Sequence, residues 1–268
     1  MTVAAEYQIL APPQRGLMGR VALLGGIGLL SLGILNAPGE GVERLKFLTA
    51  GLCALQADRQ VVLGGMMLPL CFRNTGIYLG VACSLTYLSV VRRGRWAWPR
   101  PLALALLAAF VLAMGVDGVN SLIGDVHGPT LYPPHNMLRL GTGLLAGVSL
   151  GVLVLGLTRL MVAIPESRVP GSGAAPLRAA DVAVVLAMAT PGAAAIALEA
   201  GVFAFPIGIV STLGVVAAVA CVNRWLLELT VTVRSLSSPD LRWLLAVLLA
   251  LTELAVLSTL RMMVSPIP

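Results

Sequence analysis

The run LALALLAAFVLAMGV at residues 102–116 is apolar without interruption. An α-helix rises about 1.5 Å per residue, so about 20 such residues cross the hydrocarbon core of a bilayer. The run continues at its C-terminal end and predicts a membrane-spanning helix over Leu102–Ile123. A strand of a membrane β-barrel would alternate apolar and polar residues, which this run does not do.

Six further runs of the same kind occur along the chain. They lie at residues 17–35, 75–91, 138–164, 180–201, 206–222 and 243–263. Hydrophobic residues make up 58% of the 268 residues and charged residues only 11%, more apolar surface than a soluble domain of this length can bury. The sequence therefore predicts an all-α polytopic integral membrane protein with about seven transmembrane helices.

A short Pro/Gly/Ser/Ala stretch at Val169–Pro176 interrupts the apolar runs. It predicts a division of the chain into a four-span half at residues 1–164, a linker at 165–179 and a three-span half at 180–268.

Basic residues alternate from one connecting segment to the next. One set of segments carries 12 of the 18 Lys and Arg residues, with Arg92-Arg93-Gly94-Arg95 as its strongest group. Cytoplasmic loops are enriched in Lys and Arg, so we expect the N-terminus in the cytoplasm and the C-terminus outside a bacterial inner membrane. The net charge of +6 does not indicate a nucleic-acid partner, because the arginines lie in short loops between spans.

This topology places two long segments outside. Within Asn36–Asn74, leucines recur at helical spacing from Leu45 to Leu55, which predicts a short interfacial helix. Val61–Leu70 is apolar but too short to span, and is interpreted as a re-entrant or interfacial segment. Asp125–Asn136 contains three prolines and predicts an ordered loop without regular structure.

Thiols and imidazoles gather in these outer segments. Cys53, Cys71, His127 and His135 are residue types that bind zinc or copper, and the two thiols could form a disulfide instead. The spacing is not that of a zinc knuckle and no Cys-x-x-Cys is present, so unpaired structural thiols are a third alternative. His135, beside Pro134, could also simply cap the fourth span.

Polar residues at the outer ends of the spans form a second candidate site. We expect Asp117, Asn120, Asn136 and Arg139 to form a polar cluster with Asp117 and Arg139 paired, since a buried charge needs a partner. This cluster should lie under the segment that carries Arg73 and Tyr78.

Acids inside membrane spans are costly and are functional candidates by default. Three such acids fall within predicted spans: Asp117, Glu199 and Glu253. Glu253 lies near mid-bilayer. The alternative for each acid is a hydrogen bond between helices that fixes their packing.

Four stretches, in this order along the chain, together form one sequence pattern: CALQ at residues 53–56, LPLCFRNTGIYLG at 68–80, Asp117-Gly118, and NMLRLGTG at 136–143. From about residue 53 to 147 the chain resembles the uncharacterised bacterial membrane-protein family known as domain-of-unknown-function family 2085. That family has a His where this chain has Ala54, and a second Cys where this chain has Asn74. The resemblance implies a Cys/His metal or redox site, of which Cys53 and Cys71 would be the remnant.

The function that we expect is a non-catalytic accessory subunit of a larger membrane complex, with an electron-transfer assembly of respiration or photosynthesis as the candidate complex. Its helix faces would pack against lipid, quinone, pigment or other subunits, with no intrinsic cofactor and no metal. Two alternatives stay open: a membrane enzyme with an outer thiol or metal redox site, and a transporter of small solutes or ions.

Overall fold

The computed structural model describes residues 42–53, 56–92, 96–162, 175–229 and 239–264. Within these residues six helices are long and apolar enough to cross a membrane, so the prediction of a multi-pass helical membrane protein is confirmed. The seventh predicted span, at residues 17–35, lies outside the described residues. The long helices are α3 (Phe72–Thr86, extended by the π-helical turn η3 at Tyr87–Val91), α4 (Pro101–Asp125), α5 (Asn136–Val162), α6 (Ala179–Ala197), α7 (Ala204–Leu229) and α9 (Pro239–Val264).

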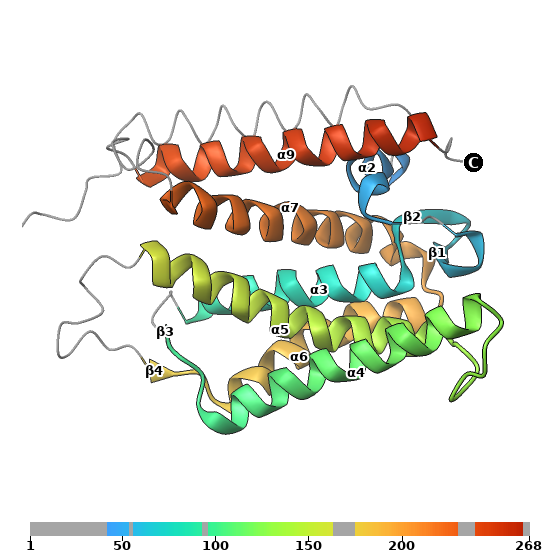
Figure 1. The fold of residues 1–268 in the computed structure, drawn as a ribbon, viewed down its shortest axis with the longest axis horizontal. Helices are drawn as coiled ribbons and strands as arrows, with labels where there is room; N and C mark the ends of the chain where they lie inside the picture. The colour runs from blue at the N-terminus through green and yellow to red at the C-terminus, as the bar shows by residue number, and fades with distance from the viewer. Residues whose placement is uncertain (1–41, 54–55, 93–95, 163–174, 230–238, 265–268) are drawn as a thin grey trace, which may run out of the picture.

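The helices run roughly along one direction, with α3 and α5 at the centre (Figure 1). α4 packs on α5, α7 packs on α3, and α9 packs on α7, while α6 contacts both α3 and α5. Among the described helices, α4 and α9 therefore lie at opposite edges of the bundle (Figure 1).

Glycines allow the two central helices to touch along their backbones. A methyl group on Gly80 of α3 would lie 2.5 Å from the Leu144 carbonyl oxygen of α5, and one on Gly147 of α5 would overlap the Ile77 carbonyl of α3. Small residues permit such close approach between membrane helices. The α3–α5 contact therefore fixes the frame on which the rest of the bundle is built.

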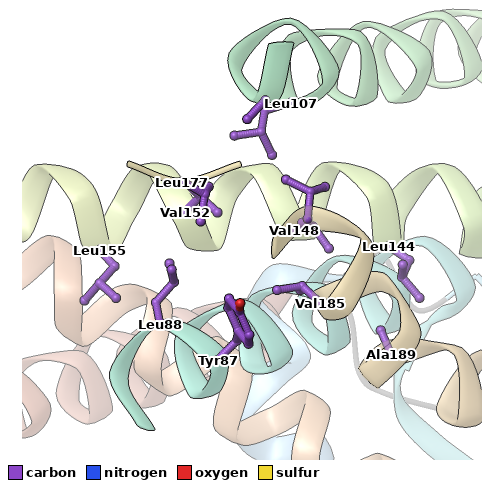
Figure 2. Packing of buried hydrophobic residues seen from close by; sticks show 12 residues of the cluster. Tyr87, Leu88, Leu107, Leu144, Val148, Val152, Leu155, Leu177, Val185 and Ala189 are labelled. Carbon is purple, nitrogen blue, oxygen red and sulfur yellow. The ribbon is translucent and has the colours of Figure 1, made fainter. Parts of the chain in front are cut away.

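The largest buried cluster joins helices from both predicted halves of the chain. Tyr87 and Leu88 of η3 meet Val148 and Val152 of α5 and Val185 of α6 (Figure 2). The halves thus share one hydrophobic core. The predicted linker lies largely outside the described residues, so the domain boundaries stay a prediction.

The segment interpreted as re-entrant forms a β-hairpin of β1 (Gln60–Leu63) and β2 (Met66–Cys71), a departure from the all-α prediction. Its two-residue turn is Gly64-Gly65, with φ of 57° and 78°, which the type I′ turn of a hairpin requires. Backbone groups pair across the hairpin, so a segment too short to span needs no helix to satisfy them.

The predicted interfacial helix is present as α2 (Val42–Thr49), followed by the helical turns η1 (Ala50–Leu52) and η2 (Ala57–Arg59). Its apolar side does not lie on lipid: Leu45 and Leu48 are buried, and α2 packs on β2, α7 and α9. α2, the hairpin and the α4–α5 loop share one end of the molecule, called here the hairpin end (Figure 1).

A short parallel pair, β3 (Trp96–Ala97) with β4 (Ala175–Pro176), lies at the other end (Figure 1). Asp181 organises the chain there. It accepts a 2.5 Å hydrogen bond from the Tyr87 hydroxyl and a 2.7 Å bond from the Arg178 backbone N–H, and Arg92 lies 3.7 Å away. An acid at the N-terminus of α6 also suits the helix dipole.

Candidate functional site

The site at the hairpin end is built around an ion pair between α3 and α4. Arg73 stands in the first turn of α3, and its Nη2 lies 2.6 Å from Oδ2 of Asp117 near the end of α4. The Asp117 carboxylate is 1% exposed. Tyr132 and Thr142 donate further hydrogen bonds to it, at 3.1 and 3.3 Å. One guanidinium and two hydroxyl groups thus hold the carboxylate.

The predicted ion pair of Asp117 with Arg139 is wrong, because Arg73 occupies that position. Arg139 stands in the first turn of α5 and is 6% exposed. It donates from Nε to Ser121 at 3.4 Å and from Nη1 to Asn136 at 2.9 Å. Ser121 also accepts a 3.0 Å bond from Arg73, so both guanidinium groups meet at one hydroxyl. No carboxylate of a described residue lies within 4.0 Å of Arg139.

The two asparagines of the cluster hold loops in place. Asn120 donates to the Tyr132 carbonyl at 2.9 Å and accepts from the Leu131 N–H at 2.7 Å, which ties the α4–α5 loop to α4. Asn136 donates to the Asp58 carbonyl at 2.8 Å, which ties α5 to the segment before the hairpin. Both asparagine side chains therefore hold the backbone of neighbouring segments in place and are not free to bind a ligand.

A second ion pair closes the outer rim of the site. Arg59, just before β1, pairs with Asp125 at the end of α4 and lies 3.5 Å from Asp58. The hydrogen bond with Asp125 raises the pKa of Arg59. In the neighbouring loop, desolvation and the bond to Asp117 raise the pKa of Tyr132, which keeps its hydroxyl a donor.

The two outer thiols lie together. Cys53 follows η1 and Cys71 ends β2, and no disulfide joins them. A hydrogen bond between the thiols, followed by burial, raises the pKa of Cys71, although the backbone N–H groups of Asn74 and Arg73 oppose that rise. Both cysteines line a cavity of about 120 Å³ together with Gln56, Arg59, Arg73, Asn74 and Arg139. Tyr78, predicted with the polar cluster, packs instead beside these thiols in an apolar cluster with Leu70 and Val215.

The histidines stay outside this cavity. His135 accepts a 3.2 Å hydrogen bond from the Met137 N–H and so caps α5, as its position beside Pro134 indicated. His127 lies in the α4–α5 loop with a φ of 57°. No group of three or more His, Cys, Asp or Glu side chains with metal-binding geometry occurs in the part of the chain that the structure describes.

The two remaining acids do not belong to the site. α6 ends at Ala197, so Glu199 lies in the following turn and not inside a span as predicted. Its φ of 51° and the bond from the Ala200 N–H to the Ala195 carbonyl give the left-handed end of a helix, a place where glycine is usual. Glu253 does stand within α9, where Asn223 of α7 donates to it at 3.1 Å. It joins two helices, as the packing alternative expected.

Several residues of the site were not singled out from the sequence. Ser121 follows Asp117 by four residues on one helix face, a spacing that could have revealed it. Tyr132, Thr142 and Asp125 carry no such signal, because only the assembled helices bring them to the site.

Residues 53–153 match the family described as "Predicted membrane protein (DUF2085)". A protein of Methanothermobacter thermautotrophicus, described as "Uncharacterized protein", is 33% identical over 111 residues, which are 41% of this chain and 91% of that relative. The chain belongs to this family. The resemblance noted in the sequence is thereby confirmed, and no solved structure matches the chain.

The DUF2085 segment contains the whole wall of the thiol cavity, from Cys53 to Arg139. It also contains α3, α4 and most of α5. Helices α6, α7 and α9 lie beyond it: α6 and α7 contact α3, and α9 packs on α7.

Proposed function

We propose that this protein is a non-catalytic accessory subunit whose helix α4 packs against another membrane protein. The observation that carries the proposal is Gly115, which stands on α4 with nothing within 4 Å of the place where a Cβ would lie. Gly76 and Gly80 of α3 and Gly143 and Gly147 of α5 are instead used for close contact within the chain. A glycine inside a helix lowers the stability of that helix by about 1 kcal/mol relative to alanine. A glycine that makes no close contact within the chain therefore points to a close contact with another protein.

The surroundings of Gly115 support a helix partner. Only 17% of the most apolar stretch of α4 is buried, against 72% for α5. Farther round the same exposed face, Ala105, Ala109 and Ala113 recur at every fourth residue, and such small-residue rows suit close helix packing. A hollow of about 390 Å³ beside Gly115, walled by Leu112 and Val119, would accept the side chains of a second helix.

The site at the hairpin end supports a function without catalysis. Its buried carboxylate already has a guanidinium partner, and Cys71 has a raised pKa. A thiol that ionises with difficulty is a poor nucleophile. The adjacency of Cys53 and Cys71 keeps the thiol enzyme as a second candidate, which requires a disulfide partner protein. The transporter alternative gains no support, because Asp117, Glu199 and Glu253 contact different elements.

A second hollow, of about 380 Å³, lies between parts of α4 and α5. Leu104, Ala108 and Val111 form one wall and Leu150 and Leu153 the other. Its apolar lining suits a lipid chain or the tail of a quinone or pigment. An electron-transfer complex of respiration or photosynthesis in a bacterial inner membrane is the assembly that we expect to contain such a subunit.

The proposal is tested by isolating the full chain from its own membrane in a gentle detergent. We expect a stoichiometric partner chain by mass spectrometry, and a crosslink from a photoreactive group at Ala109 to that partner. Gly115→Leu should release the partner, because a large side chain fills the contact. Ala187→Leu on the exposed face of α6 is the control and should retain it. A chain that is monomeric in every gentle detergent, with lipid alone at Ala109, would overturn the proposal.

A further inference from the structure

We infer that the thiol cavity at the hairpin end is a binding site for a phosphate-type oxyanion, either a free ion or the headgroup of a lipid. The cavity of about 120 Å³ is walled by Arg59, Arg73 and Arg139, with no carboxylate in its lining. This inference concerns a different face from the α4 contact and does not depend on it.

Arg139 is the main reason for expecting an anion. It is 6% exposed, and its Nη2 makes no hydrogen bond with any described residue. A buried charge without a counter-charge is strongly unfavourable unless a ligand or ordered water compensates it. The guanidinium group presents a planar fork that matches phosphate oxygens.

A neighbouring arginine adds an unmet donor. The Nε atom of Arg73 is buried and has no hydrogen-bond partner among the described residues, whereas that of Arg59 lies 3.5 Å from a carboxylate oxygen of Asp58. Buried polar atoms of this kind are rare in folded proteins, and each needs an acceptor. An oxyanion supplies several acceptors at once.

The acids near the site leave one arginine of the wall without a counter-charge. Asp117 pairs with Arg73, and Asp125 and Asp58 pair with Arg59, but no carboxylate of a described residue lies within 4.0 Å of Arg139. The first turn of α3 also faces this place, since the N–H groups of Arg73 and Asn74 approach the Cys71 sulfur. A helix N-terminus favours negative charge. Cys71, whose pKa is raised by the hydrogen bond with Cys53 and by burial, does not supply that charge.

The size of the cavity limits the ligand. Water occupies about 30 Å³ in the liquid, so about 120 Å³ holds a few waters or one small oxyanion and no large organic group. Gln56, on the wall, is exposed, which places the cavity open to the aqueous side of the hairpin end. A lipid headgroup at the membrane surface could reach the same place.

The experiment uses Asn74→Asp, which adds a carboxylate to the wall where the anion would bind. We expect inorganic phosphate, against chloride of equal ionic strength, to raise the unfolding temperature of the delipidated full chain in micelles. Asn74→Asp should unfold at a higher temperature without phosphate and bind phosphate about tenfold more weakly or worse, since a charge-assisted contact is replaced by repulsion. Thr130→Asp adds the same charge to the nearby α4–α5 loop, outside the cavity wall. Phosphate should raise its unfolding temperature as much as it raises that of the unchanged chain.

Micelles with phosphatidic acid, against micelles with diacylglycerol, separate the two sources. Stabilisation by phosphatidic acid alone assigns the site to a lipid headgroup, and stabilisation by inorganic phosphate assigns it to a free ion. If Asn74→Asp does not fold, Arg139→Lys provides the second variant, because it keeps the charge and removes the planar fork. No stabilisation by either probe, or an equal phosphate response in the unchanged chain and the variant, would overturn the inference.

Discussion

Single residues at the hairpin end are held by arginine–carboxylate pairs. Asp117 is buried, and the Arg73 guanidinium lies 2.6 Å from it. Asp117→Asn removes the negative charge and leaves Arg73 without a counter-charge. Since breaking a buried pair typically costs about 3–5 kcal/mol, and Arg73 is partly solvated, we expect a loss of about 3 kcal/mol in the free energy of unfolding. Denaturation of the chain in mixed micelles measures this loss.

Tyr132→Phe is the matched control for that substitution. It removes only the hydroxyl that donates to Asp117 at 3.1 Å, so it should cost about 1 kcal/mol. Equal losses for Asp117→Asn and Tyr132→Phe would show that the ion pair with Arg73 contributes no more than one neutral hydrogen bond.

The thiol of Cys71 should react slowly. The hydrogen bond with Cys53 and then burial raise its pKa above that of an ordinary thiol. Alkylation by iodoacetamide, followed by peptide mass spectrometry from pH 7 to pH 10, should show a delayed rise at Cys71. Cys53→Ala removes the largest cause, so the rise should move to lower pH. An inflection at Cys71 below that of a free thiol would contradict the assignment.

The same pKa shift has a consequence for stability. Because the folded state holds the Cys71 proton more tightly than the unfolded state, this contribution is fully present below the ordinary thiol pKa. It is lost as the pH rises through the higher pKa of the folded state. Alkaline solution should therefore destabilise the unchanged chain more than the Cys71→Ser variant.

Sequence spacing predicted part of this site and not the rest. Asp117 and Asn120 lie one helix turn apart, as do Asn136 and Arg139, so each pair could be placed on one helix face in advance. The choice of Arg73 over Arg139 as the partner of Asp117 depends on how α3 and α4 each pack on α5. The close backbone contacts between α3 and α5 help to set that arrangement, and no local sequence pattern predicts them.

Among the elements, the α3–α5 contact leaves the least room for change. A methyl group on Gly147 would overlap the Ile77 carbonyl, which is backbone and cannot rotate away. We expect Gly147→Ala to force the helices apart and to lower the free energy of unfolding by about 3 kcal/mol, the upper part of the range for overpacking. Unfolding in mixed micelles tests this as well.

Gly141 provides the control on the same helix. Nothing lies within 4 Å of the place where its Cβ would be, so Gly141→Ala should be neutral or should stabilise the helix by up to about 1 kcal/mol. A loss at Gly141→Ala as large as that at Gly147→Ala would mean that helix separation is not the cause.

Long apolar elements were predictable, and the hairpin was not. The six spans follow from hydropathy because the bilayer fixes their length. Val61–Leu70 has no such constraint, since an apolar run of ten residues suits a buried strand as well as an interfacial segment. Gly64-Gly65 was the one local sign of a hairpin turn, and both residues do adopt positive φ.

For the molecule as a whole, the distribution of charge predicts how it lies in the membrane. Arg92, Arg178 and Arg242 stand at the end opposite the hairpin, among segments that hold 12 of the 18 basic residues. Basic loops stay in the cytoplasm, so the hairpin end, with its thiols and its arginine-lined cavity, should face outward. The two ends can therefore be told apart by chemical labelling.

A single cysteine at each end decides the orientation. With the four native cysteines replaced, Leu131→Cys in the α4–α5 loop, where the native side chain is 81% exposed, should react with a membrane-impermeant maleimide in intact cells. Gly94→Cys, in the basic loop before α4, should react only after the cells are opened, because that loop is expected in the cytoplasm. The reverse pattern would place the thiol cavity inside the cell, where a reducing environment keeps Cys53 and Cys71 as thiols. An oxyanion bound there would then come from the cytoplasm or from the inner leaflet.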